Sequence, residues 1–212
     1  MSRDGRIWMV ALAAVACLAG VAPARAARTI VLPRAGQVGI GVQGGYGMML
    51  KTGYLGDFDR GPEIAVRLRY RMRYERAIGL SFEGQRMDIR TPEPVYPPGS
   101  PVGQGFAGRT NVRVILSGAD FYQMFGTRTR TTKMVGIGAG LAQTSSHTSD
   151  GETYYRQEGS DGAYVAINAG IERFVIHSWA IDLSTRYHAI FLPGDRSHQV
   201  QVALGVIFYA GY

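Results

Sequence analysis

Residues 63–75 read EIAVRLRYRMRYE, and this stretch decides the fold that the sequence predicts. Its even-numbered positions are all apolar or aromatic, whereas its odd-numbered positions carry four arginines, Arg67, Arg69, Arg71 and Arg73. Successive side chains of a β-strand point to opposite faces. The alternation therefore predicts a strand with one apolar face and one cationic face.

The same period of two recurs along the chain, whereas helical periodicity is almost absent after residue 36. Eight strands are predicted, over residues 37–48, 63–75, 78–85, 112–125, 135–141, 164–172, 179–188 and 200–212. Within 112–125 the apolar positions change from even to odd numbers, which predicts a β-bulge near Ser117 and Gly118. Short links alternate with long ones, which span 50–62, 88–109 and 145–161, as in an up-and-down barrel.

The composition restricts the class of protein. With 46% apolar and 18% charged residues the chain is neither disordered nor collagen-like, although it holds 29 glycines. No apolar run of about 18 residues follows the N-terminal segment, which excludes a helical membrane protein. The basic residues are arginines except for Lys51 and Lys133.

Alternating strands suit either a soluble barrel with an apolar interior or a membrane barrel with an apolar exterior. Here the polar rows hold glycine, serine, glutamine and arginine, which suits a narrow lumen. The apolar rows are nearly free of charge, and an arginine in them at the bilayer midplane would cost about 2 to 4 kcal/mol. We therefore predict an all-β, eight-stranded antiparallel up-and-down transmembrane barrel, with a soluble exported barrel as the alternative.

The N-terminal segment predicts export. Residues 1–26 have early arginines, an apolar run and the small-x-small ending Ala24-Arg25-Ala26, which is typical of a cleaved signal peptide. Residues 27–36 are then a periplasmic tail and 37–212 the barrel domain. The only cysteine, Cys17, would leave with the signal, so no disulfide is expected. Lipidation of Cys17 is the alternative, although Ala14 and the continuing apolar run fit a lipoprotein site poorly.

The chain resembles the small outer-membrane β-barrels of the OmpA and OmpX type over residues 37–212. The most specific element is the ending VQVALGVIFYAGY at 200–212, where a terminal aromatic is preceded by apolar residues at every second position. The resemblance implies that Phe208 and Tyr212 belong to the signal that the barrel assembly machinery reads. No peptidoglycan-binding domain is expected, and no loop carries a recognisable family signature.

The arginine row needs partners inside the barrel, because side chains fill the interior of an eight-stranded barrel and buried charges are normally paired. A tight turn near Glu75 joins two strands, which places Glu83 opposite or diagonal to Arg67 or Arg69. We predict a lumen charge network of Arg67, Arg69, Arg71, Arg73, Glu83, Arg113, Glu172, Asp182 and Arg186, with Glu63 and Glu75 as further candidates. It serves either as structural filling or as an anion site or gate.

No catalytic residue, metal site or cofactor is expected. The local pairs His147 with Ser149 and Ser197 with His198 lie in or beside loops with no motif around them, and His188 faces the lumen. Cys/His clusters and regularly spaced acids are both missing from the sequence, so neither zinc nor calcium is indicated.

The predicted function is a structural or surface-interaction role in the cell envelope of a Gram-negative-type cell, with both termini in the periplasm. A narrow pore using the lumen arginines and a lipid-modifying enzyme are the alternatives. The expected partners are outer-membrane lipid and lipopolysaccharide, the assembly machinery and a surface ligand of the long loops, through Tyr96, Tyr154 or Tyr155; we expect a monomer that binds no nucleic acid. An aromatic girdle is predicted from Tyr70, Tyr74, Trp179, Phe208 and Tyr212.

Overall fold

The computed structural model describes residues 34–50, 60–88, 109–149, 154–157, 159–176 and 178–210. These residues form nine strands: β1 Val38–Met49, β2 Arg60–Arg73, β3 Arg76–Asp88, β4 Arg109–Phe125, β5 Thr131–Ser149, β6 Tyr154–Gln157, β7 Asp161–Ile176, β8 Trp179–Leu192 and β9 Asp195–Ala210. Within those ranges, no helix is long and apolar enough to cross a membrane.

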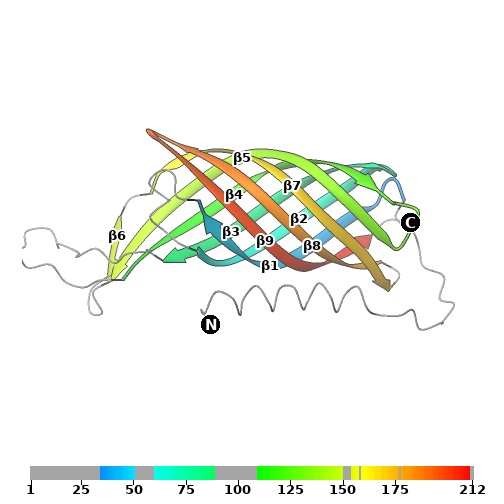
Figure 1. The fold of residues 1–212 in the computed structure, drawn as a ribbon, viewed down its shortest axis with the longest axis horizontal. Helices are drawn as coiled ribbons and strands as arrows, with labels where there is room; N and C mark the ends of the chain where they lie inside the picture. The colour runs from blue at the N-terminus through cyan, green and yellow to red at the C-terminus, as the bar shows by residue number, and fades with distance from the viewer. Residues whose placement is uncertain are drawn as a thin grey trace, which may run out of the picture.

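Eight of the strands close into one antiparallel barrel, tilted against its long axis (Figure 1). The order is β4-β3-β2-β1-β9-β8-β7-β5, and β4 pairs with β5 to close the ring. The short strand β6 pairs with the far end of β5 alone, beyond the ring. The predicted all-β, eight-stranded antiparallel barrel is confirmed, and closure leaves the ring of eight strands without an unpaired edge.

The two ends of the barrel differ. The tight turns β2–β3, β4–β5 and β7–β8 lie at one end, together with the start of β1 at Val38 and its partner Ala210 in β9; we call this the hairpin end. The strand ends Met49, Arg60, Asp88 and Arg109, and the Pro193–Gly194 turn between β8 and β9, lie at the opposite end, which we call the loop end. Part of the predicted 145–161 link is strand instead, because β5 continues to Ser149 and β6 pairs with it.

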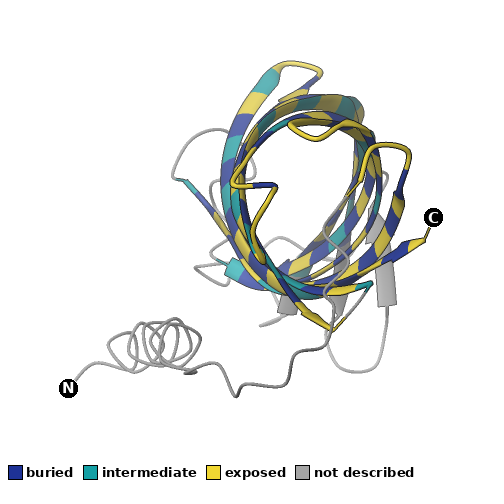
Figure 2. Ribbon diagram, turned by 90° about the vertical axis from the view of Figure 1, so that its right-hand side faces the viewer, coloured by how far each residue is buried: buried dark blue, intermediate teal, exposed yellow. Residues whose placement is uncertain are grey.

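The alternation of the sequence becomes an inside and an outside, which Figure 2 shows as alternating buried and exposed bands around the ring. On β2, Ile64 is 62% exposed whereas Arg69 is 1% exposed, and on β5 Ile137 is 64% exposed. Apolar side chains therefore cover the exterior and the arginine row faces the lumen. This arrangement contradicts the alternative of a soluble barrel with an apolar interior.

Strand β4 corrects the prediction of a bulge. It pairs with β3 and with β5 without any register shift at Ser117 and Gly118, so its even positions face inward throughout. Val112 and Leu116 are therefore buried in the lumen, and Arg113, predicted to lie inside, is exposed on the outer face. The apolar residues change face because the lumen itself becomes apolar near the loop end. The shifts that do occur lie between Arg71 and Arg73 and between Phe174 and Ile176, beside tight turns.

Two lumen-facing glycines allow a tyrosine to cross the inner wall. Gly140 of β5 pairs with Tyr164 of β7 on one side and with Gly118 of β4 on the other. The Tyr164 side chain reaches from β7 across β5 and β4, and its hydroxyl lies 3.5 Å from the Ser81 Oγ on β3. A Cβ on Gly118 would collide with the Tyr164 hydroxyl and with the Ala139 carbonyl oxygen. The absence of a side chain at Gly118 is thus a packing requirement.

Gly118→Ala is expected to lower the free energy of unfolding by about 1 to 3 kcal/mol, because one added methyl overfills this contact. The matched control is Gly44→Ala, whose Cβ would meet nothing within 4 Å, and we expect it to leave stability unchanged or slightly raised. Urea unfolding of the refolded barrel, followed by the fluorescence of Trp179, measures both. Equal midpoints for the two variants would show that Tyr164 does not need the space.

Candidate functional site

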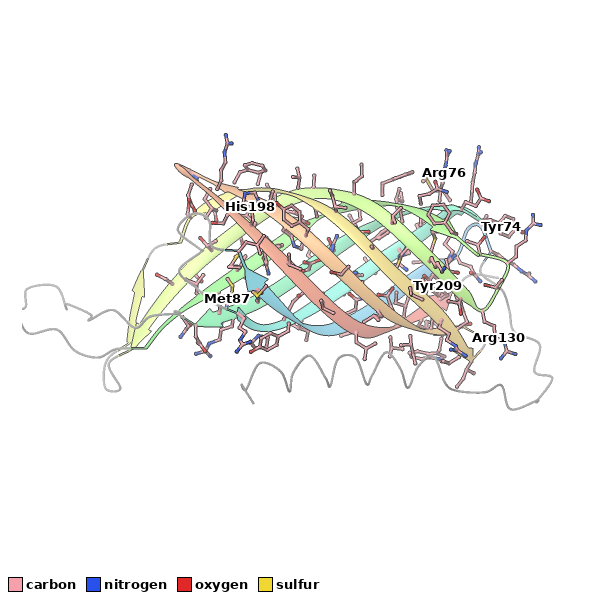
Figure 3. All side chains as sticks on the ribbon, viewed as in Figure 1. Tyr74, Arg76, Met87, Arg130, His198 and Tyr209 are labelled. Carbon is pink, nitrogen blue, oxygen red and sulfur yellow. The ribbon has the colours of Figure 1, made fainter. Side chains whose placement is uncertain are left out.

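The lumen holds a layer of charge between apolar layers. Next to the loop end, side chains from six strands form one apolar cluster, made of Met49, Met87, Val112, Val114, Leu116, Ala142, Tyr164, Ala166, Ile190 and Leu192. Nearer the hairpin end, Ala77, Tyr122, Met124 and Met134 form a second cluster, and Phe174, Ala180, Ile207 and Tyr209 a third. Figure 3 shows Met87 in one half of the barrel and Tyr209 in the other, on the side of Tyr74 and Arg76.

We call the charged residues between these clusters the lumen charge layer. It consists of Arg67, Arg69, Arg71 and Arg186 with the carboxyl groups of Glu63, Glu83, Asp120, Glu172 and Asp182, all buried. Four cationic groups thus face five carboxyl groups, so opposite charges are present in nearly equal numbers. Isolated charges in such a place would cost several kcal/mol each, which is why the pairing decides whether the barrel is stable.

Glu172 is the centre of the part nearer the hairpin end. Arg69 Nη1 donates to Glu172 Oε2 at 2.7 Å, and Arg71 Nη2 donates to Glu172 Oε1 at 3.0 Å. The Tyr209 hydroxyl donates to Glu172 Oε2 at 2.9 Å. Arg69 Nη2 also reaches Asp182 Oδ2 at 3.5 Å, and the Gln43 amide donates to Asp182. Arg69 and Arg71 are therefore joined through one shared carboxylate, that of Glu172 on β7, and Arg69 also contacts Asp182 on β8.

Glu83 and Arg186 form the centre of the part nearer the loop end. The Arg186 guanidinium contacts both Glu83 and Asp120, and Arg67 Nη2 lies 3.7 Å from Glu83 Oε1. His188 Nε2 lies 3.3 Å from the other Glu83 oxygen. Arginine suits this position because its planar fork binds two carboxylates at once and keeps its charge without water.

Aromatic rings cover the remaining faces of the guanidinium groups. The Arg69 guanidinium carbon lies 4.7 Å from the centre of the Tyr122 ring, and that of Arg71 lies 4.8 Å from the Tyr209 ring. The Tyr122 hydroxyl donates to Asp120 Oδ2 at 3.1 Å, so the same ring contacts a cation and a carboxylate. Such contacts replace part of the hydration that the arginines lose.

The structure brings together seven of the nine residues predicted for this network: Arg67, Arg69, Arg71, Glu83, Glu172, Asp182 and Arg186. Glu83 lies diagonal to Arg67, since Ser81 is the direct partner of Arg67 and Ala65 that of Glu83. Arg73 does not belong to the layer, because it is exposed beside the β2–β3 turn. Arg113 does not belong to it either, because β4 has no bulge.

One member of the charge layer, Asp120, and two of the aromatic residues around it were missing from the prediction. Asp120 lies between Ala119 and Phe121, both of which face outward, so the alternation already indicated that it points inward. Tyr122 and Tyr209 also contact the buried arginines, and aromatic residues on an inner face carry no sequence signal for that role. Of the predicted assembly signal, Phe208 is exposed on the outer face at the hairpin end, and Tyr212 lies outside the described residues.

The candidate catalytic pairs do not form a site in the described part of the chain. Ser197 is buried and faces the lumen, whereas His198 faces outward, where its Nδ1 lies 2.6 Å from the Tyr187 hydroxyl. The side chains of His147 and Ser149 are outside the described set. No group of three His, Cys, Asp or Glu side chains that could hold a metal ion occurs among the residues described.

The comparisons with known proteins identify the fold. No family model matches the chain, and no curated protein matches it. Among solved structures, Neisserial surface protein A from Neisseria shares 15% identity, with a TM-score of 0.54, over 82% of this chain and 98% of that one. Outer membrane protein OprG from Pseudomonas aeruginosa shares 12% identity, with a TM-score of 0.52, over 87% of this chain and 100% of that one.

The chain therefore has the fold of the small outer-membrane β-barrels, as its resemblance to the OmpA and OmpX type predicted. At these sequence identities the similarity shows the architecture of the barrel and assigns no role to any residue of the lumen. The charge layer has to be understood from its own contacts.

Arg69→Met is expected to lower the free energy of unfolding by about 3 to 5 kcal/mol, because it leaves Glu172 and Asp182 short of a buried cation. Arg73→Met, which removes the same charge from an exposed position on the same row, should change it by less than about 0.5 kcal/mol. Equilibrium unfolding in lipid vesicles compares the two. A charge layer without structural importance would give the two variants the same midpoint.

Proposed function

We propose that the protein is an integral outer-membrane protein whose closed barrel serves a structural or surface-interaction role in the cell envelope. The observation that carries the proposal is the distribution of apolar surface. In the described residues, 31 large apolar side chains are exposed on the barrel wall. Soluble monomers rarely expose apolar patches beyond a few hundred Å², so a belt of this extent requires hydrocarbon around it.

The orientation follows from the two ends. In small outer-membrane barrels the turns on the periplasmic side are short and the outer loops longer, so the hairpin end would face the periplasm. Four of the aromatic residues predicted for a girdle, Tyr70, Tyr74, Trp179 and Phe208, are exposed toward that end. Trp179 and Phe208 pair across β8 and β9 with ring centres 5.1 Å apart. Export by a cleaved signal peptide over residues 1–26 and assembly through Phe208 and Tyr212 belong to the same proposal.

The lumen favours a closed barrel over a pore. Arg69, Arg71, Glu172 and Asp182 are each exposed by 1% or less, so water does not reach the middle of the charge layer. The apolar clusters on either side would further oppose the entry of ions. With its interior filled, the barrel would act through its outer wall and its loops, and outer-membrane lipid, lipopolysaccharide and a surface ligand are its proposed partners.

Cysteine accessibility tests the placement in the membrane. In a Cys17→Ser background, single cysteines at Ile137 and Val202 should resist a water-soluble maleimide in whole cells, because both side chains would contact acyl chains. A cysteine at Pro193 should react from outside, and one at Glu75 only after the outer membrane is permeabilised. Rapid labelling at Ile137 and Val202 would contradict a lipid-facing wall, and labelling at Glu75 before Pro193 would reverse the orientation.

Planar-bilayer recordings test the closed lumen. The purified barrel should give no stable single-channel steps, since paired side chains fill its centre, whereas an open porin in the same membrane serves as the positive control. Reproducible steps that change in an Arg69→Ala variant would replace this proposal with the pore hypothesis. Mass spectra of lipid A should also stay unchanged when the protein is overproduced; a new acylation state would support the lipid-modifying enzyme instead.

A further inference from the structure

The outer wall carries a hollow near the loop end, over β2, β3 and β4. Ile64, Gly84 and Ile115 form one row across these strands, in which Gly84 is the direct partner of both isoleucines. The direction in which Gly84 would carry a Cβ is open, with no atom within 4 Å. The isoleucines therefore flank an empty position. The resulting space, of about 390 Å³, extends toward the loop end to Arg86 and Arg113.

Arg86 and Arg113 are direct cross-strand partners on β3 and β4, and both are exposed on the outer wall. Like charges placed directly opposite each other destabilise a sheet. Across the described residues, neither arginine forms an ion pair with a carboxylate. Asp88 lies two residues beyond Arg86 on β3, and its cross-strand backbone partner is Asn111. The repulsion between the two guanidinium groups would disappear if an anion bound both of them.

The position of the pair selects the kind of anion. Toward the hairpin end, the outer wall continues with Ile64, Ile115 and Phe82, which are 62%, 43% and 52% exposed, so the arginines mark the edge of the apolar belt. Charged side chains cost little at that level of a membrane barrel, whereas they are costly at its centre. A ligand that fits both parts has a charged head beside the guanidinium groups and a hydrocarbon chain along the hollow.

We infer that Arg86 and Arg113 bind a phosphate of the phosphorylated glycolipid in the outer leaflet, with one of its acyl chains lying over Gly84 between Ile64 and Ile115. Guanidinium forks bind phosphate oxygens in pairs, and two forks from neighbouring strands can hold one phosphate. The inference deepens the proposed function and rests on it, because only that orientation places the loop end in the glycolipid leaflet. A phospholipid with a zwitterionic head brings an ammonium group together with its single phosphate, so it would compensate the arginine repulsion less than the glycolipid does.

The hairpin end supplies a matched control. Arg73 and Arg76 are also direct cross-strand partners, on β2 and β3, and both are exposed. They flank the tight β2–β3 turn, where no glycine leaves a hollow of the kind at Gly84. A double substitution there removes the same charge from another pair of neighbouring strands, one of which, β3, also carries Arg86.

The test uses the full-length exported protein, purified in detergent and checked for a folded barrel by its heat-dependent gel mobility. Native mass spectrometry measures how much hexa-acylated bis-phosphorylated lipid A stays bound, with phosphatidylcholine as the neutral lipid. The wild type should retain lipid A, and Arg86→Gln/Arg113→Gln should lower its retention about tenfold, the expected effect of losing charge-assisted hydrogen bonds to phosphate. Arg73→Gln/Arg76→Gln should retain lipid A like the wild type.

A second variant separates the lipid from a free phosphate. Gly84→Leu fills the hollow and leaves both arginines in place, so it should also lose lipid A if the acyl chain lies there. Equal retention by Gly84→Leu and the wild type, together with competition by inorganic phosphate, would reduce the site to a phosphate contact and overturn the lipid assignment. Equal retention by the two double variants, or equal loss in both, would overturn the site itself. Neither result would change the maleimide labelling of the single cysteines at Ile137 and Val202. Failure of the proposed function would change that labelling, so the two failures can be distinguished.

Discussion

Pairing between guanidinium groups and carboxylates inside the barrel is the interaction on which the rest of the structure depends. A strand that turns Ile64, Val66 and Tyr70 toward hydrocarbon must turn the residues between them into the lumen, because the side-chain period is two. On β2 the lumen-facing residues include Arg67, Arg69 and Arg71, which are almost completely buried. Their charges are tolerable only because Glu172, Asp182 and Glu83 arrive from three other strands. The apolar exterior and the ionic interior therefore follow from the same constraint, the side-chain period of two.

Local alternation predicted which way side chains point on seven of the eight barrel strands, since the same period applies at every residue. It failed on the first half of β4, where Val112, Val114 and Leu116 are apolar and yet face the lumen. An apolar residue on such a strand is acceptable on either side wherever the lumen is itself apolar, as it is near the loop end. The prediction assumed a lumen that is polar along its whole length, and for that reason it wrongly placed Arg113 inside and a bulge at Ser117. Register with β3 and β5, which the sequence does not encode locally, decides the phase.

Contacts across the lumen were beyond sequence reasoning for a different physical reason. Glu83 could be placed opposite or diagonal to Arg67 or Arg69 because a tight turn joins β2 and β3, and the register makes it diagonal to Arg67. Arg186 meeting Asp120, or Tyr209 meeting Glu172, joins strands that do not pair with each other. Such contacts depend on strand tilt and shear, which set the level along the axis at which each side chain arrives. Composition indicated that the arginines need carboxylates, and only the closed barrel determines which ones.

The arginines of this chain lie in two different environments. Those inside the barrel stabilise the fold, whereas the exposed pair on the outer wall is available to a ligand. Inside, Arg69 and Arg71 share Glu172, aromatic rings cover their faces, and both side chains are buried, so a ligand from outside does not reach them. Outside, Arg86 and Arg113 face each other across two strands with no carboxylate between them in the described structure. The packed lumen makes the barrel wall rigid. A rigid wall holds the backbones of Arg86 and Arg113 at a fixed separation, which limits how far the two charges can move apart. The ion pairs of the lumen charge layer thus preorganise Arg86 and Arg113 for an anion, because folding of the barrel already supplies the free energy that brings the two arginines together.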